Sequence, residues 1–191
     1  FETWKGALKA QGTETEPIVF TSNAVTPAAG DWKGIYFRKG ADISSVLDYC
    51  RIEYGGNSQN ANVYIYSSSP TIKNSVIQYS SNAGMRIEGG SPSIIANTIQ
   101  LSLDAGIRMK GSASPNVTGN TIQNNVAGIY AEDSGPSPFI ATNKLLNNSS
   151  YPISLYPTNA TNLGDNTATG NLEDVIELRA GNISRDTTWP K

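Results

Sequence analysis

A tandem repeat is the feature that most restricts how this chain can fold. Residues 83–104 read "AGMRIEGGSPSIIANTIQLSLD", and residues 105–126 read "AGIRMKGSASPNVTGNTIQNNV". Three landmarks recur in fixed phase over four units: Ala61, Ala83, Ala105 and Ala127; Pro70, Pro92, Pro115 and Pro138; and Ile77, Ile99, Ile122 and Leu145. A regular repeat of this kind indicates one supersecondary unit that buries its apolar face only when it is stacked on its copies.

The pattern inside each unit indicates short strands. In "GMRIEGG", Met85 and Ile87 fall on one face and Arg86 and Glu88 on the other, which is the period of two of a β-strand. "SPSI" and "NTIQ" begin two further short runs, and Gly and Pro separate the runs. No segment keeps the i, i+3, i+4, i+7 spacing of a helix, so we predict three strands per unit.

Three short strands per unit predict an all-β fold, namely a right-handed, single-stranded parallel β-helix. We expect about six to seven coils of about 22–24 residues and three parallel sheets, with about 4.8 Å between coils. A leucine-rich repeat shares the period, but it needs a Leu pattern and a helical segment that this sequence lacks. We predict a single domain over 1–191, with N-terminal coils in 1–32, the clear repeat in 33–179, and in 180–191 a tail or the start of a following module.

Aligning the units gives four columns of apolar residues that should point inward. The columns are Ile35, Val63, Met85, Ile107, Ile129, Ile153, Ile176; Phe37, Ile65, Ile87, Met109, Ala131, Leu155, Leu178; Leu47, Ile72, Ile94, Val117, Ile140; and Ile52, Ile77, Ile99, Ile122, Leu145. A polar column lies between the second and third strands: Cys50, Ser75, Asn97, Asn120, Asn143. Stacked amides can hydrogen-bond to one another, so we interpret it as a structural ladder with Cys50 as a buried, inert member.

Composition restricts the chemistry. The chain has no histidine, which excludes histidine general bases, Ser-His-Asp triads and histidine-ligated zinc. Its net charge of −2 and the lack of a basic stripe argue against a nucleic-acid partner. No apolar run reaches the length of a membrane span. We expect no cofactor and no metal site.

Three segments carry a resemblance to a known family: "AQGTETEPIVFTSNAVTPAAGDWKGIYF", "SSVLDYCRIEYGG" and "SSSPTIKNSVIQYSS". They resemble the right-handed parallel β-helix repeat modules of prokaryotic secreted and cell-surface proteins, in the pectate-lyase-like superfamily. The resemblance implies a secreted or cell-surface location. It also implies a role among adhesins, surface-layer and filament components, or non-catalytic segments of polysaccharide-active enzymes.

The enzymes of the superfamily that this chain resembles carry their catalytic groups along one parallel sheet. These groups are carboxylates, or calcium together with a basic residue. Here the outward positions of the "TIQ" strands include a single acidic residue, Glu53, and no paired carboxylates. We therefore expect no enzymatic activity and predict a non-catalytic structural or adhesive module, including a filament or surface-layer subunit. The alternative is a carbohydrate-binding or polysaccharide-active (lyase- or hydrolase-like) module.

The outward column of the "GMRIEGG" strands is the candidate binding site. It contains Tyr36, Tyr64, Arg86, Arg108 and Tyr130. Tyrosine rings stack on sugars, and arginine pairs with carboxylate or sulfate in two-point fashion, so the column suits an acidic polysaccharide or another surface protein. The alternative is that Glu88 and Glu132 neutralise two arginines that would otherwise repel each other.

The ends of the stack suggest further partners. A β-helix presents an open sheet edge at each end, and such an edge pairs readily with other strands. We expect the chain to contact copies of itself end to end, or adjoining modules of a larger protein. Trp189 is predicted to cover part of the core at the C-terminal end.

Overall fold

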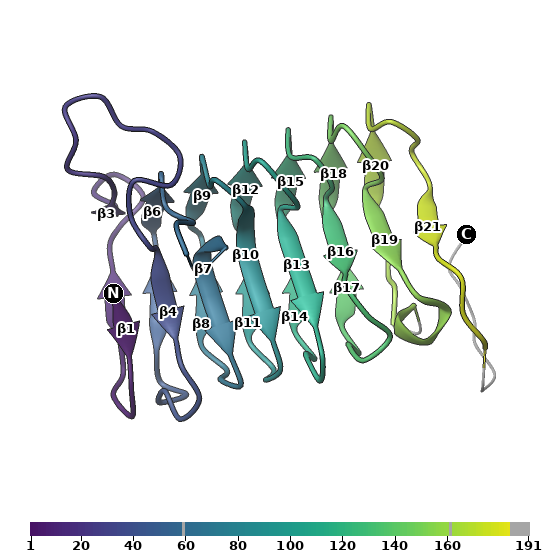
Figure 1. Ribbon diagram of the computed structural model, residues 1–191, viewed down its shortest axis with the longest axis horizontal. Coiled ribbons are helices and arrows are strands. Elements are labelled where there is room, and N and C mark those ends of the chain that lie inside the picture. The colour runs from purple at the N-terminus through teal and green to yellow at the C-terminus, as the bar shows by residue number, and fades with distance from the viewer. Residues whose placement is uncertain (59, 161, 184–191) are drawn as a thin grey trace.

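The computed structural model describes residues 1–58, 60–160 and 162–183. The chain winds around one long axis, and each coil lies beside the previous one from the N-terminus to the C-terminus (Figure 1). Apart from one short 3-10 helix, η1 (Pro157–Asn159), the elements are strands. Within the described residues, no helix has the length and apolar character needed to cross a bilayer. Trp189 lies outside the described residues.

The strands form three parallel sheets, whose members follow in spatial order. Sheet A contains β1 (Glu2–Thr3), β4 (Ile35–Phe37), β7 (Ala61–Tyr66), β10 (Ala83–Glu88), β13 (Ile107–Lys110), β16 (Ile129–Ala131), β19 (Ile153–Leu155) and β21 (Ile176–Leu178). Sheet B contains β2 (Lys9–Gln11), β5 (Val46–Asp48), β8 (Thr71–Lys73), β11 (Ser93–Ile95), β14 (Asn116–Thr118) and β17 (Phe139–Ala141). Sheet C contains β3 (Ile18–Phe20), β6 (Cys50–Glu53), β9 (Val76–Gln78), β12 (Thr98–Gln100), β15 (Thr121–Gln123), β18 (Lys144–Leu146) and β20 (Thr167–Thr169).

The register of these sheets confirms the predicted fold class. Ile99 pairs with Ile77 on one side and with Ile122 on the other, and the other inward columns align in the same way. Six coils contribute a strand to all three sheets, from β1–β3 to β16–β18. A further coil has β19 and β20, and in the described residues it meets sheet B through a bridge between Ile140 and Leu163.

The first two coils are longer than the sequence repeat predicts. Glu2 pairs with Tyr36 and Tyr36 with Tyr64, whereas from Tyr64 onward the next partner, Arg86, follows at the regular interval. The extra length of the first coil lies in residues 21–34, which leave the stack as the loop at the upper left of Figure 1. This loop is fastened by Trp32, whose indole Nε1 donates a 2.8 Å hydrogen bond to the Glu53 carbonyl oxygen. The regular period therefore begins only at β7.

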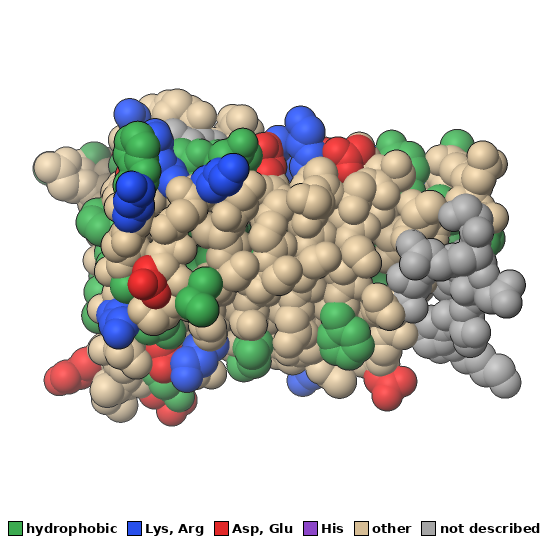
Figure 2. Space-filling view, turned by 90° about the horizontal axis from the view of Figure 1, so that it is seen from below, with side chains coloured by type: hydrophobic (Ala, Val, Ile, Leu, Met, Phe, Trp, Pro, Cys, Tyr) green, Lys and Arg blue, Asp and Glu red, His purple; other side chains and the backbone are tan. Residues whose placement is uncertain are grey.

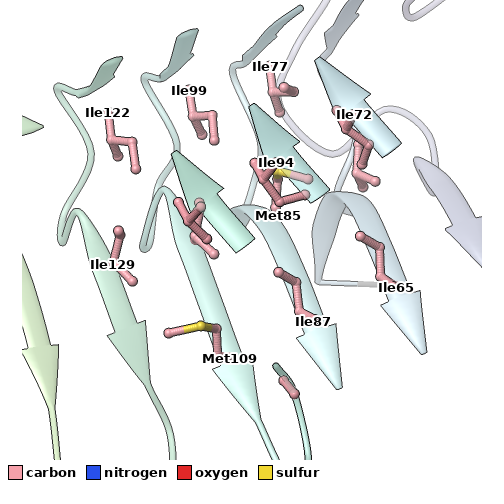
Figure 3. Close-up of a cluster of buried hydrophobic side chains, with 14 of the residues drawn as sticks. Ile65, Ile72, Ile77, Met85, Ile87, Ile94, Ile99, Met109, Ile122 and Ile129 are labelled. Carbon is pink, nitrogen blue, oxygen red and sulfur yellow. The ribbon is translucent and has the colours of Figure 1, made fainter. Parts of the chain in front are cut away.

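The interior consists of the aligned apolar columns. Figure 3 shows Ile77, Ile99 and Ile122 in one row, and the side chains of Ile87 and Met109 at equivalent positions on sheet A. Most of these side chains are completely buried. Full burial of one such side chain contributes about 1.5–3 kcal/mol, and most of the covering surface belongs to the coils above and below.

The Ala-Gly landmark marks a close approach between coils. A Cβ atom added at Gly106 would lie 2.5 Å from Ile122 Cγ2 and 3.0 Å from the Gly128 carbonyl oxygen. Neither neighbour has room to move, because Ile122 is fully buried and Gly128 belongs to the next coil. The repeat therefore keeps glycine here for space.

Two corners of each coil from β4 to β18 use a residue with positive φ. On the path from sheet B to sheet C these residues are Tyr49, Asn74, Ala96, Gly119 and Thr142, and on the path from sheet C to sheet A they are Tyr54, Tyr79, Leu101, Asn124, Asn147 and Gly170. Asn and Gly adopt this conformation readily, whereas Leu101 and Thr142 do so at a cost on the order of 1 kcal/mol. The hydrogen bonds of the residue that follows each corner offset that cost.

A ladder of side chains occupies the first corner, at the positions predicted from the sequence. The Asn97 backbone N–H donates to Asn120 Oδ1 at 2.8 Å, and the Asn120 N–H donates to Asn143 Oδ1 at 2.9 Å. Asn120 Nδ2 also donates back to the Ile94 carbonyl oxygen at 2.9 Å, so each amide links three coils. The ladder continues to Asn166, beyond the predicted column, and at the other end the Cys50 N–H donates to Ser75 Oγ.

A second ladder, absent from the sequence analysis, occupies the other corner. The Ser102 N–H donates to Asn125 Oδ1, the Asn125 N–H to Asn148 Oδ1, and the Asn148 N–H to Asn171 Oδ1. Asp174 Oδ1 accepts hydrogen bonds from both the backbone N–H and the Nδ2 of Asn171. The carboxylate thus takes the place of the next asparagine at the C-terminal end.

Cys50 is buried where the first ladder begins. Its thiol donates to the Ala10 carbonyl oxygen at 3.5 Å. Burial raises the pKa of the thiol to about 11, so at neutral pH it carries its proton and is a poor nucleophile.

We predict that Asn120→Ala lowers the free energy of unfolding by about 3 kcal/mol, because it leaves buried donors and acceptors of two neighbouring coils without partners. Urea denaturation followed by circular dichroism measures the change. Asn116→Ala, at an exposed position of β14, is the matched control and should cost at most about 0.5 kcal/mol. Equal losses for the two variants would show that the ladder does not stabilise the stack.

Candidate functional site on the outer face of sheet A

The structure places all five predicted binding residues in one column on the outer face of sheet A. Tyr36 pairs with Tyr64, Tyr64 with Arg86, Arg86 with Arg108, and Arg108 with Tyr130. They point outward because the alternate positions of the same strands hold the buried columns. The sequence therefore located the column, and its role in binding stays a prediction.

Carboxylates surround the two arginines at the centre of the column. Glu132, the residue after β16, reaches across two coils, and its carboxylate accepts hydrogen bonds from Arg86 Nη1 and Nη2, both at 3.1 Å. The same carboxylate accepts a 3.1 Å hydrogen bond from Arg108 Nη1. Glu88 Oε1 takes a 2.8 Å hydrogen bond from Arg86 Nε, and Asp104 binds Arg108 at two points, 2.6 and 2.7 Å.

This network removes the repulsion that stacking two arginines would cause. Glu88 forms its ion pair with Arg86 rather than with Lys110 on the next strand, and Lys110 lies 3.8 Å from Glu132. The outward residues Glu88, Lys110 and Glu132 therefore do not form a simple alternating row of ion pairs, because Arg86 reaches both glutamates. Three cations face three carboxylates, and the arginine side chains are largely buried by their partners.

The ionisation of Glu132 depends on this arrangement. Partial burial acts to raise its pKa, but the hydrogen bonds and charges of Arg86 and Arg108 outweigh burial, and the pKa of Glu132 is lowered. Burial likewise acts to lower the pKa of Arg86, and the hydrogen bonds and charges of Glu132 and Glu88 raise it. Both charges are thus retained at neutral pH, and most hydrogen-bonding positions of Arg86 are already occupied.

The tyrosines at the two ends of the column have different surroundings. The Tyr36 and Tyr64 rings are stacked, with centroids 4.6 Å apart and an interplanar angle of 12°. Tyr130 lies between two guanidinium groups, with Arg108 Cζ 4.8 Å and Arg179 Cζ 4.2 Å from its ring centroid, and its hydroxyl accepts a 2.7 Å hydrogen bond from Arg179. Tyr130 and Tyr36 are both partly buried: Tyr130 lies between two guanidinium groups, and Tyr36 lies between the Tyr64 ring and the Arg38 guanidinium group.

A hollow beside Tyr36, which the sequence analysis missed, adds residues outside the predicted column. It measures about 320 Å³ and is lined by Trp4, Tyr36, Arg38, Lys39 and Tyr66. Arg38 and Tyr66 stand in the next outward column, and Trp4 belongs to the first coil, which is longer than the regular repeat. The signal in the sequence was the pair of adjacent cations that follows β4, Arg38 and Lys39. The outward tyrosines of β4 and β7 lie close to this pair.

The outer face of sheet C uses its polar side chains in another ladder. Gln123 Nε2 donates to Gln100 Oε1 at 2.7 Å, Gln100 Nε2 to Gln78 Oε1 at 2.9 Å, and Gln78 Nε2 to Glu53 Oε2 at 2.8 Å. Glu53 was predicted to be an outward-pointing carboxylate. It does point outward, but it is only 8% exposed, because Thr21 of the N-terminal loop covers it and donates a hydrogen bond to Oε1. In the described part of the chain, no group of three or more His, Cys, Asp or Glu side chains is arranged to hold a metal ion.

Comparison with known families shows which family this chain belongs to. A family model described as a right-handed β-helix region matches residues 12–183. The chain belongs to the right-handed β-helix family. The handedness predicted from the sequence is confirmed with it, and the pectate-lyase-like superfamily is consistent with this family. No curated protein and no solved structure matches the chain.

We predict that Glu132→Gln lowers the free energy of unfolding of the β-helix at neutral pH by about 2 kcal/mol, because Arg86 and Arg108 then share no carboxylate. The folded-state pKa of Glu132 is depressed, so its contribution is present above the unfolded-state pKa and is lost as the pH falls through the folded-state value. Urea denaturation at a series of acidic pH values should therefore show a smaller decline in the variant.

The exposed Glu173 provides the control. Glu173→Gln removes an equal charge from a position without an ion pair in the described residues, so it should leave the pH profile and the free energy of unfolding close to those of the parent. A loss equal to that of Glu132→Gln would mean that net charge, and not the network, sets the stability.

Proposed function

We propose that this β-helix is a non-catalytic, extracellular module with a structural or adhesive role in a prokaryotic surface protein or filament. The observation that carries the proposal is that polar side chains bond along the axis of the stack. The asparagine ladders, the glutamine ladder and the Arg86–Glu132–Arg108 network each join one coil to the next. Side chains that bond along the axis stiffen a rod. On the outer faces of the sheets, they also occupy the positions where a catalytic group would stand.

The surface supports the same proposal. The middle of the side shown in Figure 2 consists almost entirely of uncharged polar side chains and backbone. The one acidic side chain among the outward positions of β6, β9, β12, β15 and β18 is Glu53, which is covered and bonded to Thr21 and Gln78. Acid–base cleavage of a glycan needs two carboxyl groups at adjacent heights that are free to act on the substrate.

The open edges of the stack supply the assembly part of the proposal. The strands β1, β2 and β3 lie at one edge of their sheets, and β21, β17 and β20 at the other. Ile18 and Val19 at the first end, and Val175 and Ile176 at the second, are exposed apolar side chains next to these edges. Strands of an adjoining module, or of a second copy stacked end to end, would cover them.

A carbohydrate-binding role is the second candidate. It is favoured by the hollow lined by Trp4, Tyr36, Arg38, Lys39 and Tyr66, which combines exposed aromatic rings with cations. This candidate is compatible with adhesion, because a rod that holds such a site at one end would attach to a glycan without altering it.

The test is turnover. The purified chain is incubated with pectate, alginate, xylan and a neutral glucan, and reducing ends and unsaturated uronate products are measured against a heat-denatured control. We expect no product above the control. Product formation from any of these glycans would overturn the non-catalytic assignment.

Electron microscopy of the same samples over a range of concentrations measures particle length. The length should increase with concentration where the chain stacks on copies of itself, and it should stay constant where the chain adjoins other modules.

A further inference from the structure

The N-terminal end of sheet A carries aromatic and cationic side chains that no ladder uses. We call the hollow lined by Trp4, Tyr36, Arg38, Lys39 and Tyr66 the Trp4 pocket; its volume is about 320 Å³. This volume lies at the lower end of the range for small-molecule sites, and it suits a small ligand or one portion of a longer polymer.

Two aromatic rings of the Trp4 pocket are exposed, and the third is held in place by stacking. Trp4 is 70% exposed and Tyr66 is 40% exposed. The Tyr36 ring is fixed by stacking on Tyr64, and Tyr64 is in turn 6.5 Å from the tilted ring of Tyr66. Exposed aromatic faces contribute little to the fold, and they are well suited to stack on the C–H faces of a sugar ring.

The cations of the Trp4 pocket differ from the arginines in the middle of sheet A. Arg38 Cζ lies 5.3 Å from the Trp4 ring centroid and 5.0 Å from that of Tyr36. Its ion-pair partner in the described chain is Glu2 alone, at 3.0 Å, and both side chains are at least a third exposed. Arg86, in contrast, is bound by two carboxylates and is 14% exposed.

Lys39 adds a second positive charge to the pocket. It is exposed and forms no ion pair within the described residues. The Trp4 pocket therefore contains two cations and one carboxylate, Glu2, at its side. Unlike the Arg86–Arg108 region, it has donors available for an anion.

We propose that the Trp4 pocket binds an anionic saccharide, with a sugar ring on Trp4 and Tyr66 and its carboxylate or sulfate at Arg38 and Lys39. This inference rests on the proposed non-catalytic adhesive role and names the class of ligand for it. We therefore place the anion site at the end of the sheet and not at the Arg86–Arg108 pair. At that pair, Glu132, Glu88 and Asp104 already occupy the positions that an anion would take. A nucleic acid fits less well, because the chain has a net charge of −2.

The test is a titration of the full chain, followed by isothermal calorimetry, with four probes. These are a short galacturonate oligomer, a sulfated oligosaccharide of similar length, a neutral cello-oligosaccharide and a single-stranded DNA oligonucleotide. We expect binding of the galacturonate oligomer, the sulfated probe or both, and the preference identifies the anion. The affinity should fall when NaCl is raised from about 50 mM to about 500 mM, because screening weakens the ion pairs at this exposed site.

Variants connect the binding to the pocket. Trp4→Ala should weaken binding of the anionic probe by about tenfold and Lys39→Gln by about fivefold, through loss of the stacking face and of one charge. Each change lies at an exposed side chain, so thermal unfolding should be unaltered. Phe139→Ala, at an exposed aromatic position on sheet B, and Lys144→Gln, at an exposed lysine on sheet C, are the matched controls and should leave affinity within about twofold of the parent.

Four results would overturn the inference: no binding of either anionic probe, equal or tighter binding of the neutral probe, tighter binding of the DNA, or unchanged affinity in either pocket variant. The same titrated samples are assayed for reducing ends and unsaturated uronate. Product there would overturn the non-catalytic function while leaving the pocket assignment intact. Loss of the pocket assignment without product would leave the structural role standing.

Discussion

Each coil relies on its neighbours to cover its aliphatic side chains. A single coil of three short strands encloses too little volume to exclude water from Ile77 or Ile99, and only the side chains stacked above and below complete the burial. The parallel backbone hydrogen bonds hold each inward residue over its copy. The regular period of the sequence is the consequence, since any change in phase would turn inward residues outward.

The same alignment governs the outer surface. Whatever residue stands outward on one coil is stacked on its counterpart, so chemically similar groups meet. For amides this is favourable, as in the ladders through Asn120 and Asn125, because one amide both donates and accepts. For Arg86 and Arg108 it is unfavourable, and Glu132 solves the problem by bonding to both. The face that looked most suitable for anion binding is therefore already occupied by the protein's own carboxylates, whereas the end of the stack, where the repeat is irregular, has cations to offer.

The sequence predicted those features that the period specifies. Alternation in "MRIE" and the fixed phase of Ile77, Ile99 and Ile122 were enough to assign the strands, the inward columns and the first asparagine ladder. The second ladder was missed because its asparagines begin only at Asn125, after Ser102, and the corner conformation of Leu101 carries no compositional signal. The reach of Glu132 over two coils depends on side-chain conformation. Trp4 could not be placed, because the loop at residues 21–34 removes the first coil from the common period.

Removal of one whole coil is the most direct test of stacking in phase. Deletion of residues 84–105 joins Ala83 to Gly106 and keeps every column aligned. The shortened chain should keep its β-sheet circular dichroism and cooperative unfolding, and small-angle scattering should show a rod shorter by about 4.8 Å. Deletion of residues 84–94, half a coil, should abolish cooperative unfolding because it shifts the columns out of phase. Loss of folding in the whole-coil deletion, or equal folding of both, would contradict the conclusion that coil-to-coil alignment holds this protein together.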